Sequence, residues 1–131
     1  MDILLTHGYF LFEDKAERRI MKPYPPLGIL YLSSYLKAKG FTVEVFDTTF
    51  KSKSEFYRHI DAHNPSIVGI YVNLMTKLNV LEQIKYLKSK NKTIIVGGPD
   101  VPAYAEEYVR FGADIAVLGE GELIMEQLLP A

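Results

Sequence analysis

The chain has 131 residues, enough for one domain with a substantial core, and 48% of them are hydrophobic against 24% charged. Its formal net charge of −1 gives no field that would draw it to nucleic acid or to an anionic membrane. Because there is no cysteine, disulfides, thiolate zinc sites, cysteine nucleophiles and cysteine-ligated iron–sulfur clusters are excluded from this sequence.

Five apolar runs of strand length recur along the chain. They are rich in β-branched residues and mostly do not alternate with polar ones, which is typical of strands covered by helices on both faces. The runs cover residues 3–5, 41–46, 67–72, 93–96 and 115–118.

Stretches with helical spacing of apolar residues lie between and after these runs. They cover residues 28–39, 54–62, 78–89, 103–111 and 122–129. Gly40 and Gly112 each follow a predicted helix, and glycine takes the left-handed conformation of a helix end at little cost. Ser54 is the predicted N-cap of the second helix.

This alternation predicts parallel strands joined by right-handed crossovers. We expect one α/β domain over residues 1–131, a flavodoxin-like (Rossmann-like), doubly wound five-stranded sheet in the order 2-1-3-4-5 with helices on both faces. Residues 7–27 form the one long irregular stretch, which we interpret as functional, disordered, or both.

In such a sheet, ligands bind at the carboxyl ends of the strands where the strand order reverses, here between the first and third strands. The rim predicted for that crevice consists of residues 7–9, 73–76, 97–100 and 119–122. The most informative local feature is Gly97-Gly98-Pro99 after an apolar strand, although a plain turn before a helix has a similar composition.

Several familiar chemistries are disfavoured. Neither G-x-G-x-x-G nor G-x-x-x-x-G-K-[ST] follows the first strand, which argues against dinucleotides and nucleoside triphosphates. A phospho-acceptor aspartate is missing from the end of the third strand, where Val72-Asn73 stands. Glu120 and Glu122 are near a helix start, where they serve as acids, as ligands or as partners of the helix dipole. No nucleophile or base accompanies them, so catalysis is disfavoured.

The three histidines carry weak signals. His59 and His63 lie four residues apart on or just after a short helix, a spacing that suits two metal ligands on one face. No third ligand follows at a useful spacing, so we interpret both as surface histidines. His7 ends the first strand and is either a rim residue of the site or an ordinary loop residue.

Three segments, taken together, resemble the cobalamin-binding domain at the front of many radical SAM enzymes. Residues 25–36 (PPLGILYLSSYL) and then 40–47 (GFTVEVFD) are similar to its opening P-P-L-G-L-x-Y-L-A-A-x-L…G-x-x-V-x-x-x-D. Residues 96–101 (VGGPDV) are similar to V-G-G-P-H-x, and residues 114–122 (DIAVLGEGE) to D-x-V-V-x-G-E-G-E. The segments occur in the family's order and at normal spacing, so the resemblance extends over essentially all 131 residues.

The resemblance implies that cobalamin lies on the carboxyl edge of the sheet, with its nucleotide tail between strand ends. In the family, a barrel with a C-x-x-x-C-x-x-C motif follows, which holds a [4Fe–4S] cluster and S-adenosylmethionine. We therefore expect a non-catalytic fragment of a radical SAM enzyme, of the class B methyltransferase type. The cofactor-binding residues implied by the resemblance are Thr6, His7, Gly8, Asn73, Leu74, Met75, Thr76, Gly97, Gly98, Pro99, Asp100, Val101, Gly119, Glu120 and Gly121.

Two departures from related domains sharpen this expectation. The D-x-H-x-x-G motif, whose histidine binds cobalt in methionine-synthase-type domains, is absent, so His7 is not assigned to cobalt and the chain is expected to supply no metal ligand. Asp100 stands where the family often has histidine, which leaves it as a ligand contact or a helix cap.

Two alternatives stay open: a cofactor-free docking or gating domain of a radical SAM protein, and a flavodoxin-like binder of FMN. The lack of a Ser/Thr-rich phosphate loop after the first strand counts against FMN. The expected partners are cobalamin and the barrel of the same polypeptide, with no nucleic acid and no membrane. The start of the chain does not resemble a signal peptide, and no apolar stretch nears the ~20 residues that span a bilayer, so we expect a cytoplasmic protein.

Overall fold

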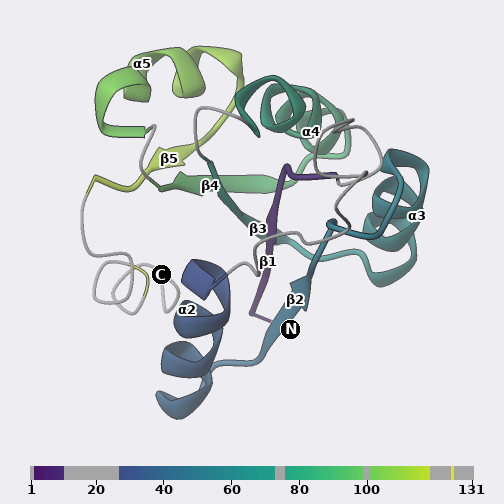
Figure 1. Ribbon diagram of the computed structural model, residues 1–131, viewed down its shortest axis with the longest axis vertical. Helices are drawn as coiled ribbons and strands as arrows, with labels where there is room; N and C mark the ends of the chain where they lie inside the picture. Colours follow the sequence, from purple (N-terminus) through teal and green to yellow (C-terminus); the bar gives the residue numbers. More distant parts are fainter. Residues whose placement is uncertain (1, 11–26, 73–75, 99–100, 119–124, 126–131) are drawn as a thin grey trace, which may run out of the picture.

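Five parallel strands form a single sheet in the order β2-β1-β3-β4-β5 (Figure 1). The structure, a computed structural model, describes residues 2–10, 27–72, 76–98, 101–118 and 125. The predicted order and the parallel direction of the strands are confirmed. The strands are β1 (Ile3–His7), β2 (Val43–Phe46), β3 (Ile67–Tyr71), β4 (Thr93–Gly97) and β5 (Ile115–Ala116).

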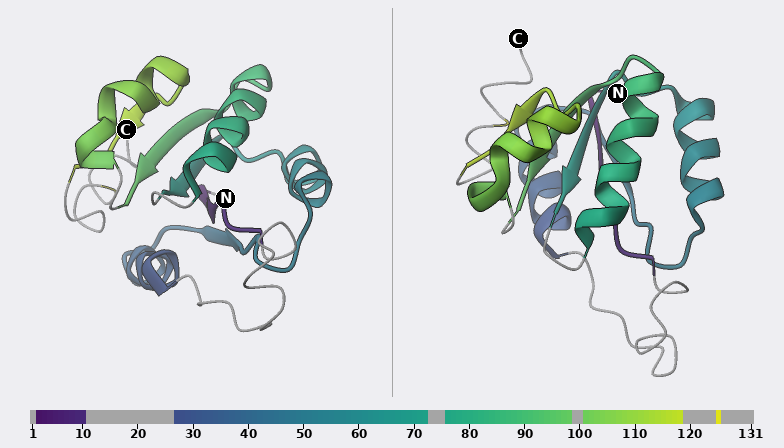
Figure 2. Two further views of the ribbon diagram at one scale, coloured as in Figure 1. Left: turned by 45° about the horizontal axis from the view of Figure 1, so that its top comes forward. Right: turned by 90° about the horizontal axis from the view of Figure 1, so that it is seen from above.

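Helices cover both faces of this sheet, as predicted (Figure 2). The described helices are α2 (Leu27–Ala38), α3 (Lys53–His63), α4 (Lys77–Ser89) and α5 (Val101–Phe111). Helices α3, α4 and α5 pack on one face and α2 packs on the other. Of the predicted helix 122–129, only Met125 lies within the described residues, and most of the irregular stretch 7–27 lies outside them. In the described ranges, no helix has both the length and the apolar character that a membrane crossing requires.

The two faces divide the core because successive side chains of a strand point to opposite sides of the sheet. Leu4 of β1 faces α3, α4 and α5, whereas its neighbours Ile3 and Leu5 face α2. All five residues of β1 are buried, since this strand has a neighbour on each side and a helical layer on each face. The buried strands therefore read as continuous apolar runs in the sequence.

The ends of the helices agree with the predictions at two glycines and differ at one cap. Gly40 and Gly112 have φ values of +94° and +127°, which confirms the left-handed backbone expected of them. The prediction of Ser54 as the cap of α3 is wrong: the N-cap is Ser52, whose hydroxyl accepts a hydrogen bond of 3.1 Å from the amide of Glu55. The Glu55 side chain accepts one in return from the Ser52 amide, which completes a capping box.

Candidate functional site

The carboxyl ends of β1, β3 and β4 lie side by side at one edge of the sheet. In the strand register, His7 pairs with Tyr71, and Tyr71 pairs with Gly97. The chain leaves β1 toward α2 on one face and leaves β3 toward α4 on the other, so the strand order reverses between them. This is the point at which open α/β sheets bind ligands.

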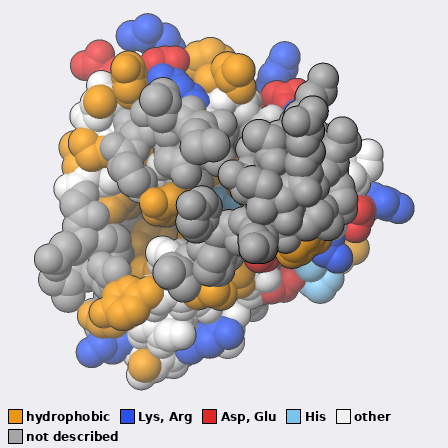
Figure 3. Space-filling model, viewed as in Figure 1, with side chains coloured by type: hydrophobic (Ala, Val, Ile, Leu, Met, Phe, Trp, Pro, Cys, Tyr) orange, Lys and Arg blue, Asp and Glu red, His pale blue; other side chains and the backbone are white. Residues whose placement is uncertain are grey.

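A cavity of about 200 Å³ opens beside these strand ends, between the sheet and α2. Its walls are mostly apolar, and its deeper part reaches Leu5 and Ile95 in the middle of their strands. In the space-filling view, apolar side chains are visible between the grey segments, in the area above α2 in the orientation of Figure 1 (Figure 3). The lining comprises Leu5, Ile29, Leu32, Ile70, Tyr71, Ile95, Val117 and Met125, together with Gly28, Gly69, Gly97 and Gly98.

Gly69 and Gly97 line this cavity for different reasons. Both residues lie on the α2 face, since Gly97 follows Ile95 by two positions and Gly69 pairs with Ile95 across the ladder. A Cβ at Gly69 would lie 2.9 Å from Cδ2 of Leu5, which leaves it no room. A Cβ at Gly97 would meet Cβ of Val117 at 3.7 Å, an ordinary contact, so there glycine leaves free space rather than relieving a clash.

Gly98 is glycine for a different reason. Its φ of +120° is a backbone conformation that other residues rarely adopt. A Cβ there would lie 2.9 Å from the amide nitrogen of Val72 and still closer to its carbonyl oxygen. The same turn lets the Val72 amide donate a hydrogen bond of 2.8 Å to the carbonyl of Gly97, which continues the β3–β4 ladder to the cavity mouth.

On the other side of the switch point, His7 is held in a polar network. Its Nδ1 accepts a hydrogen bond of 3.1 Å from the amide of Tyr9, so Nε2 carries the proton and donates to Oδ1 of Asp47 at 2.7 Å. Burial lowers the pKa of His7, and the hydrogen bond and charge of Asp47 oppose this only in part. The result is a neutral imidazole with both ring nitrogens engaged.

Asp47, directly after β2, is the charged member of this network. Burial favours its protonation, but hydrogen bonds from the hydroxyl and amide of Thr49 and from His7 outweigh that effect and lower the pKa of Asp47. The buried Thr48 donates its hydroxyl proton toward the carbonyl of Tyr9, at 2.6 Å. The end of β2 therefore fixes the loop that follows β1.

Helix α4 anchors the same loop from the other side. The amide of Asn79 donates to the carbonyl of Gly8 at 2.9 Å, and Nε2 of Gln83 donates to the carbonyl of His7 at 2.9 Å. A Cβ at Gly8 would lie 2.7 Å from Cγ2 of Val80, so only glycine lets the loop approach the helix this closely. Oε1 of Gln83 is buried and has no hydrogen-bond partner within the described part of the chain.

The structure brings together only some of the residues implied by the resemblance. Gly97 and Gly98 line the cavity, while Thr6, His7 and Gly8 belong to the neighbouring polar side of the edge. Thr76 is buried at the start of α4, and Val101 lies in the core of the opposite face. The others lie outside the described residues: Asn73, Leu74, Met75, Pro99, Asp100, Gly119, Glu120 and Gly121.

Sequence reasoning missed two parts of the site. Gly28 and Gly69 share the cavity wall with Gly97, and the signal for Gly69 was its place in the middle of a buried strand, where glycine often marks a close approach. The polar cluster formed by Asp47, Thr48 and Thr49 was visible as three polar residues that follow a predicted strand. Because parallel strands end at one edge, that position alone placed them near His7.

Comparisons with known proteins give a family match and a relative for this chain. A family model described as "B12 binding domain" matches residues 19–129. Hopanoid C-3 methylase from Methylococcus capsulatus is 25% identical to the chain over 135 aligned positions. The alignment covers 98% of this chain and 25% of the methylase, so the chain spans about a quarter of the length of that relative.

Proposed function

Because the chain belongs to the B12-binding domain family, we propose that it binds cobalamin at the carboxyl edge of its sheet, with the base of the nucleotide tail in the cavity beside α2. The observation that carries the proposal is the cavity itself. It opens at the strand-order switch point, and four glycines stand among the mostly apolar residues that line it.

The size and chemistry of the cavity fit the aromatic end of that tail. An apolar cavity of about 150 Å³ admits benzene, and this one measures about 200 Å³. Pockets that take up whole ligands usually measure about 300–1,000 Å³. We therefore assign only the flat base of the tail to the cavity, where Gly97 leaves room for it, and place the corrin ring outside on the rim.

The proposal includes binding without a histidine ligand to cobalt. His7 ends β1 at this edge of the sheet, but its Nδ1 accepts from Tyr9 and its Nε2 donates to Asp47. Neither nitrogen has a lone pair free for a metal. With its base in the cavity, the cofactor is bound base-off.

Cobalamin, when bound, supplies a cobalt atom that carries and transfers a methyl group. The residues of this chain then have a binding role: the cavity excludes water from the base, and the network of His7, Asp47 and Thr48 keeps the first loop in place. A methyl transfer reaction, and a radical SAM domain with its [4Fe–4S] cluster and S-adenosylmethionine, belong to the proposed full-length protein. Similarity to a methylase four times as long supports this context. A C-x-x-x-C-x-x-C motif encoded after residue 131 is the expected sign of that domain.

The experiment that tests binding compares Gly97→Leu with a matched variant. A leucine at residue 97 extends into the cavity without backbone conflict, whereas Ala62→Leu adds the same kind of bulk at an exposed position of α3. Each protein is mixed with hydroxocobalamin or methylcobalamin, passed through a desalting column and examined by visible absorption. We expect the wild type and Ala62→Leu to retain the chromophore and Gly97→Leu to lose it.

Two further measurements complete the test. FMN, carried through the same procedure, is expected to elute with the salt, and its retention instead of cobalamin would support the flavodoxin-like alternative. Electron paramagnetic resonance of bound, reduced cobalamin is expected to show no nitrogen ligand to cobalt. Retention of cobalamin by none of the folded proteins would contradict the proposal, as would equal retention by Gly97→Leu.

A further inference from the structure

Two histidines of α3 face the same way. His59 and His63 are four residues apart, which places them one above the other on a helix. Their rings stack with centroids 4.0 Å apart and planes inclined by 18°. His59 also packs against the ring of Phe46 in β2, with centroids 4.4 Å apart. These contacts orient the first ring before any ligand arrives.

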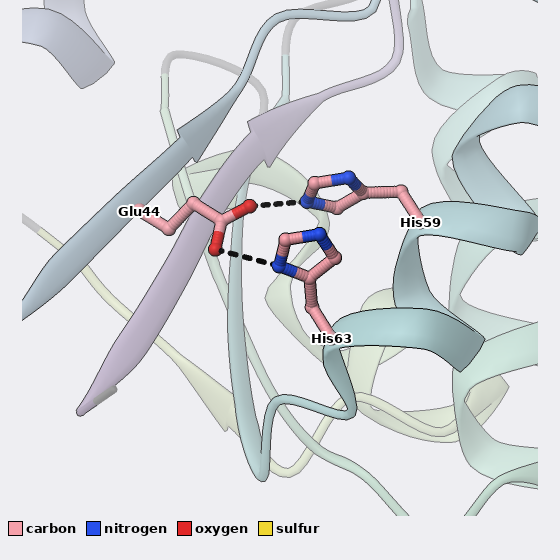
Figure 4. Close-up of side chains that lie close together, drawn as sticks. All are labelled: Glu44, His59 and His63. Carbon is pink, nitrogen blue, oxygen red and sulfur yellow. Dashed lines mark hydrogen bonds and ion pairs between the residues drawn. The ribbon is translucent and has the colours of Figure 1, made fainter.

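A carboxylate from the edge strand stands opposite both rings (Figure 4). Glu44 of β2 pairs in register with Leu4, so its side chain points to the face that α3 covers. Oε1 of Glu44 contacts Nε2 of His59, and Oε2 lies 3.3 Å from Nδ1 of His63. The three side chains thus present two nitrogens and a carboxylate toward one point, with ligand atoms within 4.8 Å of one another.

We propose that Glu44, His59 and His63 bind a divalent transition-metal ion of the zinc type. Two imidazoles and one carboxylate are a ligand set that Zn²⁺ accepts, with a fourth position left for water. Zinc bonds of about 2.0–2.2 Å set tetrahedral ligand atoms about 3.3–3.5 Å apart. The distance of 3.3 Å from Glu44 to His63 already matches this spacing, and only the closer contact to His59 has to open.

The surroundings suit a site that exchanges its ion with solvent. The side chains of His59 and Glu44 are 20% and 28% exposed, and that of His63 is 47% exposed, so the ion has a path from solution. Bound metal would also link the edge strand β2 to α3.

This site is independent of the proposed cobalamin site. The cluster lies on the face covered by α3, whereas the cavity lies on the face covered by α2. The ring of His7 is engaged elsewhere and is not among the ligands. The metal and the cofactor can therefore be tested separately, and failure of one leaves the other standing.

The test is a metal titration of the chelator-treated protein. Co²⁺ serves as the spectroscopic probe, because its visible absorption reports nitrogen and oxygen ligands in tetrahedral geometry, and Zn²⁺ is then added to displace it. We expect one equivalent of Co²⁺ to bind, Zn²⁺ to remove the absorption, and Zn²⁺ to raise the thermal unfolding midpoint. A ligand that binds the folded state but not the unfolded state raises the unfolding midpoint in this way.

Variants identify the ligands. Loss of an outer-shell partner alone weakens metal binding about 10–100-fold, so Glu44→Gln is expected to weaken it at least tenfold, and His59→Asn combined with His63→Asn to abolish it. Glu106→Gln changes an exposed carboxylate of α5 in the same way and is expected to bind like the wild type. Urea midpoints without metal verify that each variant is folded.

Two results would overturn the proposal. In the first, the wild type takes up no more Co²⁺ or Zn²⁺ than the double histidine variant does. In the second, Glu44→Gln binds as tightly as the wild type, so that Glu44 is not a ligand and the three-residue site does not exist.

Discussion

Gly97 and Gly98 are adjacent, yet the structure predicts opposite responses to the same substitution. Gly98→Ala places a Cβ against the Val72 backbone, 2.9 Å from its amide nitrogen, at a φ of +120°. Such a backbone conformation costs a residue other than glycine about 1–3 kcal/mol. Relief of the clash requires β3 and β4 to separate at the hydrogen bond from Val72 to Gly97, worth about 1 kcal/mol. The expected loss in the free energy of unfolding is therefore about 2–4 kcal/mol.

Gly97→Ala is the matched control for this variant. Its Cβ would meet Val117 at 3.7 Å, and its φ is not positive, so no strain is introduced. Alanine also reduces the conformational freedom of the unfolded chain, which stabilises the protein by about 0.4–1 kcal/mol at compatible positions. We expect Gly97→Ala to be as stable as the wild type or slightly more stable.

Urea unfolding followed by far-ultraviolet circular dichroism measures both effects. Equal slopes with shifted midpoints would show that the free energy of unfolding has changed while the compactness of the unfolded state has not. The reasoning is refuted if Gly98→Ala loses less than about 1 kcal/mol, the typical effect of an arbitrary substitution, or if the two variants are destabilised equally. It also follows that Gly98 is a poor position for testing ligand binding, because its substitution damages the fold first.

Two more predictions concern stability. Ser52→Ala removes the hydroxyl that caps α3 and is expected to lower the free energy of unfolding by about 1 kcal/mol. Ser54→Ala is expected to change the free energy of unfolding by less than about 0.5 kcal/mol. Equal effects of the two substitutions in urea unfolding would contradict the assignment of the cap. Acid is expected to destabilise the fold through His7, because its lowered pKa means that below the ordinary value of 6.5 the unfolded chain takes up a proton that the folded chain does not. The lowered pKa of Asp47 adds a loss in the same direction below 3.8, its ordinary value. In urea midpoints measured against pH, the gap between the wild type and His7→Gln should narrow as the pH falls through 6.5, and parallel curves would show that His7 carries no such effect.

The order of the sheet was predictable because strands buried on both faces appear in the sequence as continuous apolar runs, which alternate here with helical segments. The ends of the strands were less predictable. The apolar run 3–5 continues as strand through Thr6 and His7, both buried. Their polar groups are satisfied by the carbonyl of Phe46 and the carboxylate of Asp47. The polarity of these two residues therefore concealed the last part of β1, since their partners lie at the end of β2 and directly after it.

One local interpretation was wrong, and one side-chain cluster was not anticipated. Ser52 and Ser54 are both acceptable caps, but only Ser52 has a glutamate three residues later, so the signal for the correct cap was present in the sequence. The group of Glu44, His59 and His63 gave no such signal. Glu44 stands fifteen residues before His59 on a different element, and only the register of β2 and the packing of α3 bring them together.

The glycine walls of the cavity determine how this site responds to mutation. A pocket shaped by large side chains changes when one of them is shortened or rotates. Here Gly69 and Gly97 have no side chain to shorten or rotate, so the part of the wall that they form is fixed before a ligand arrives, and ordering it adds little to the entropic cost of binding. Random substitution at these two positions adds atoms and can only narrow the opening. A lineage that no longer needs the ligand would therefore be expected to fill the pocket at Gly97, where a side chain is tolerated, while Gly98 stays glycine for the sake of the fold.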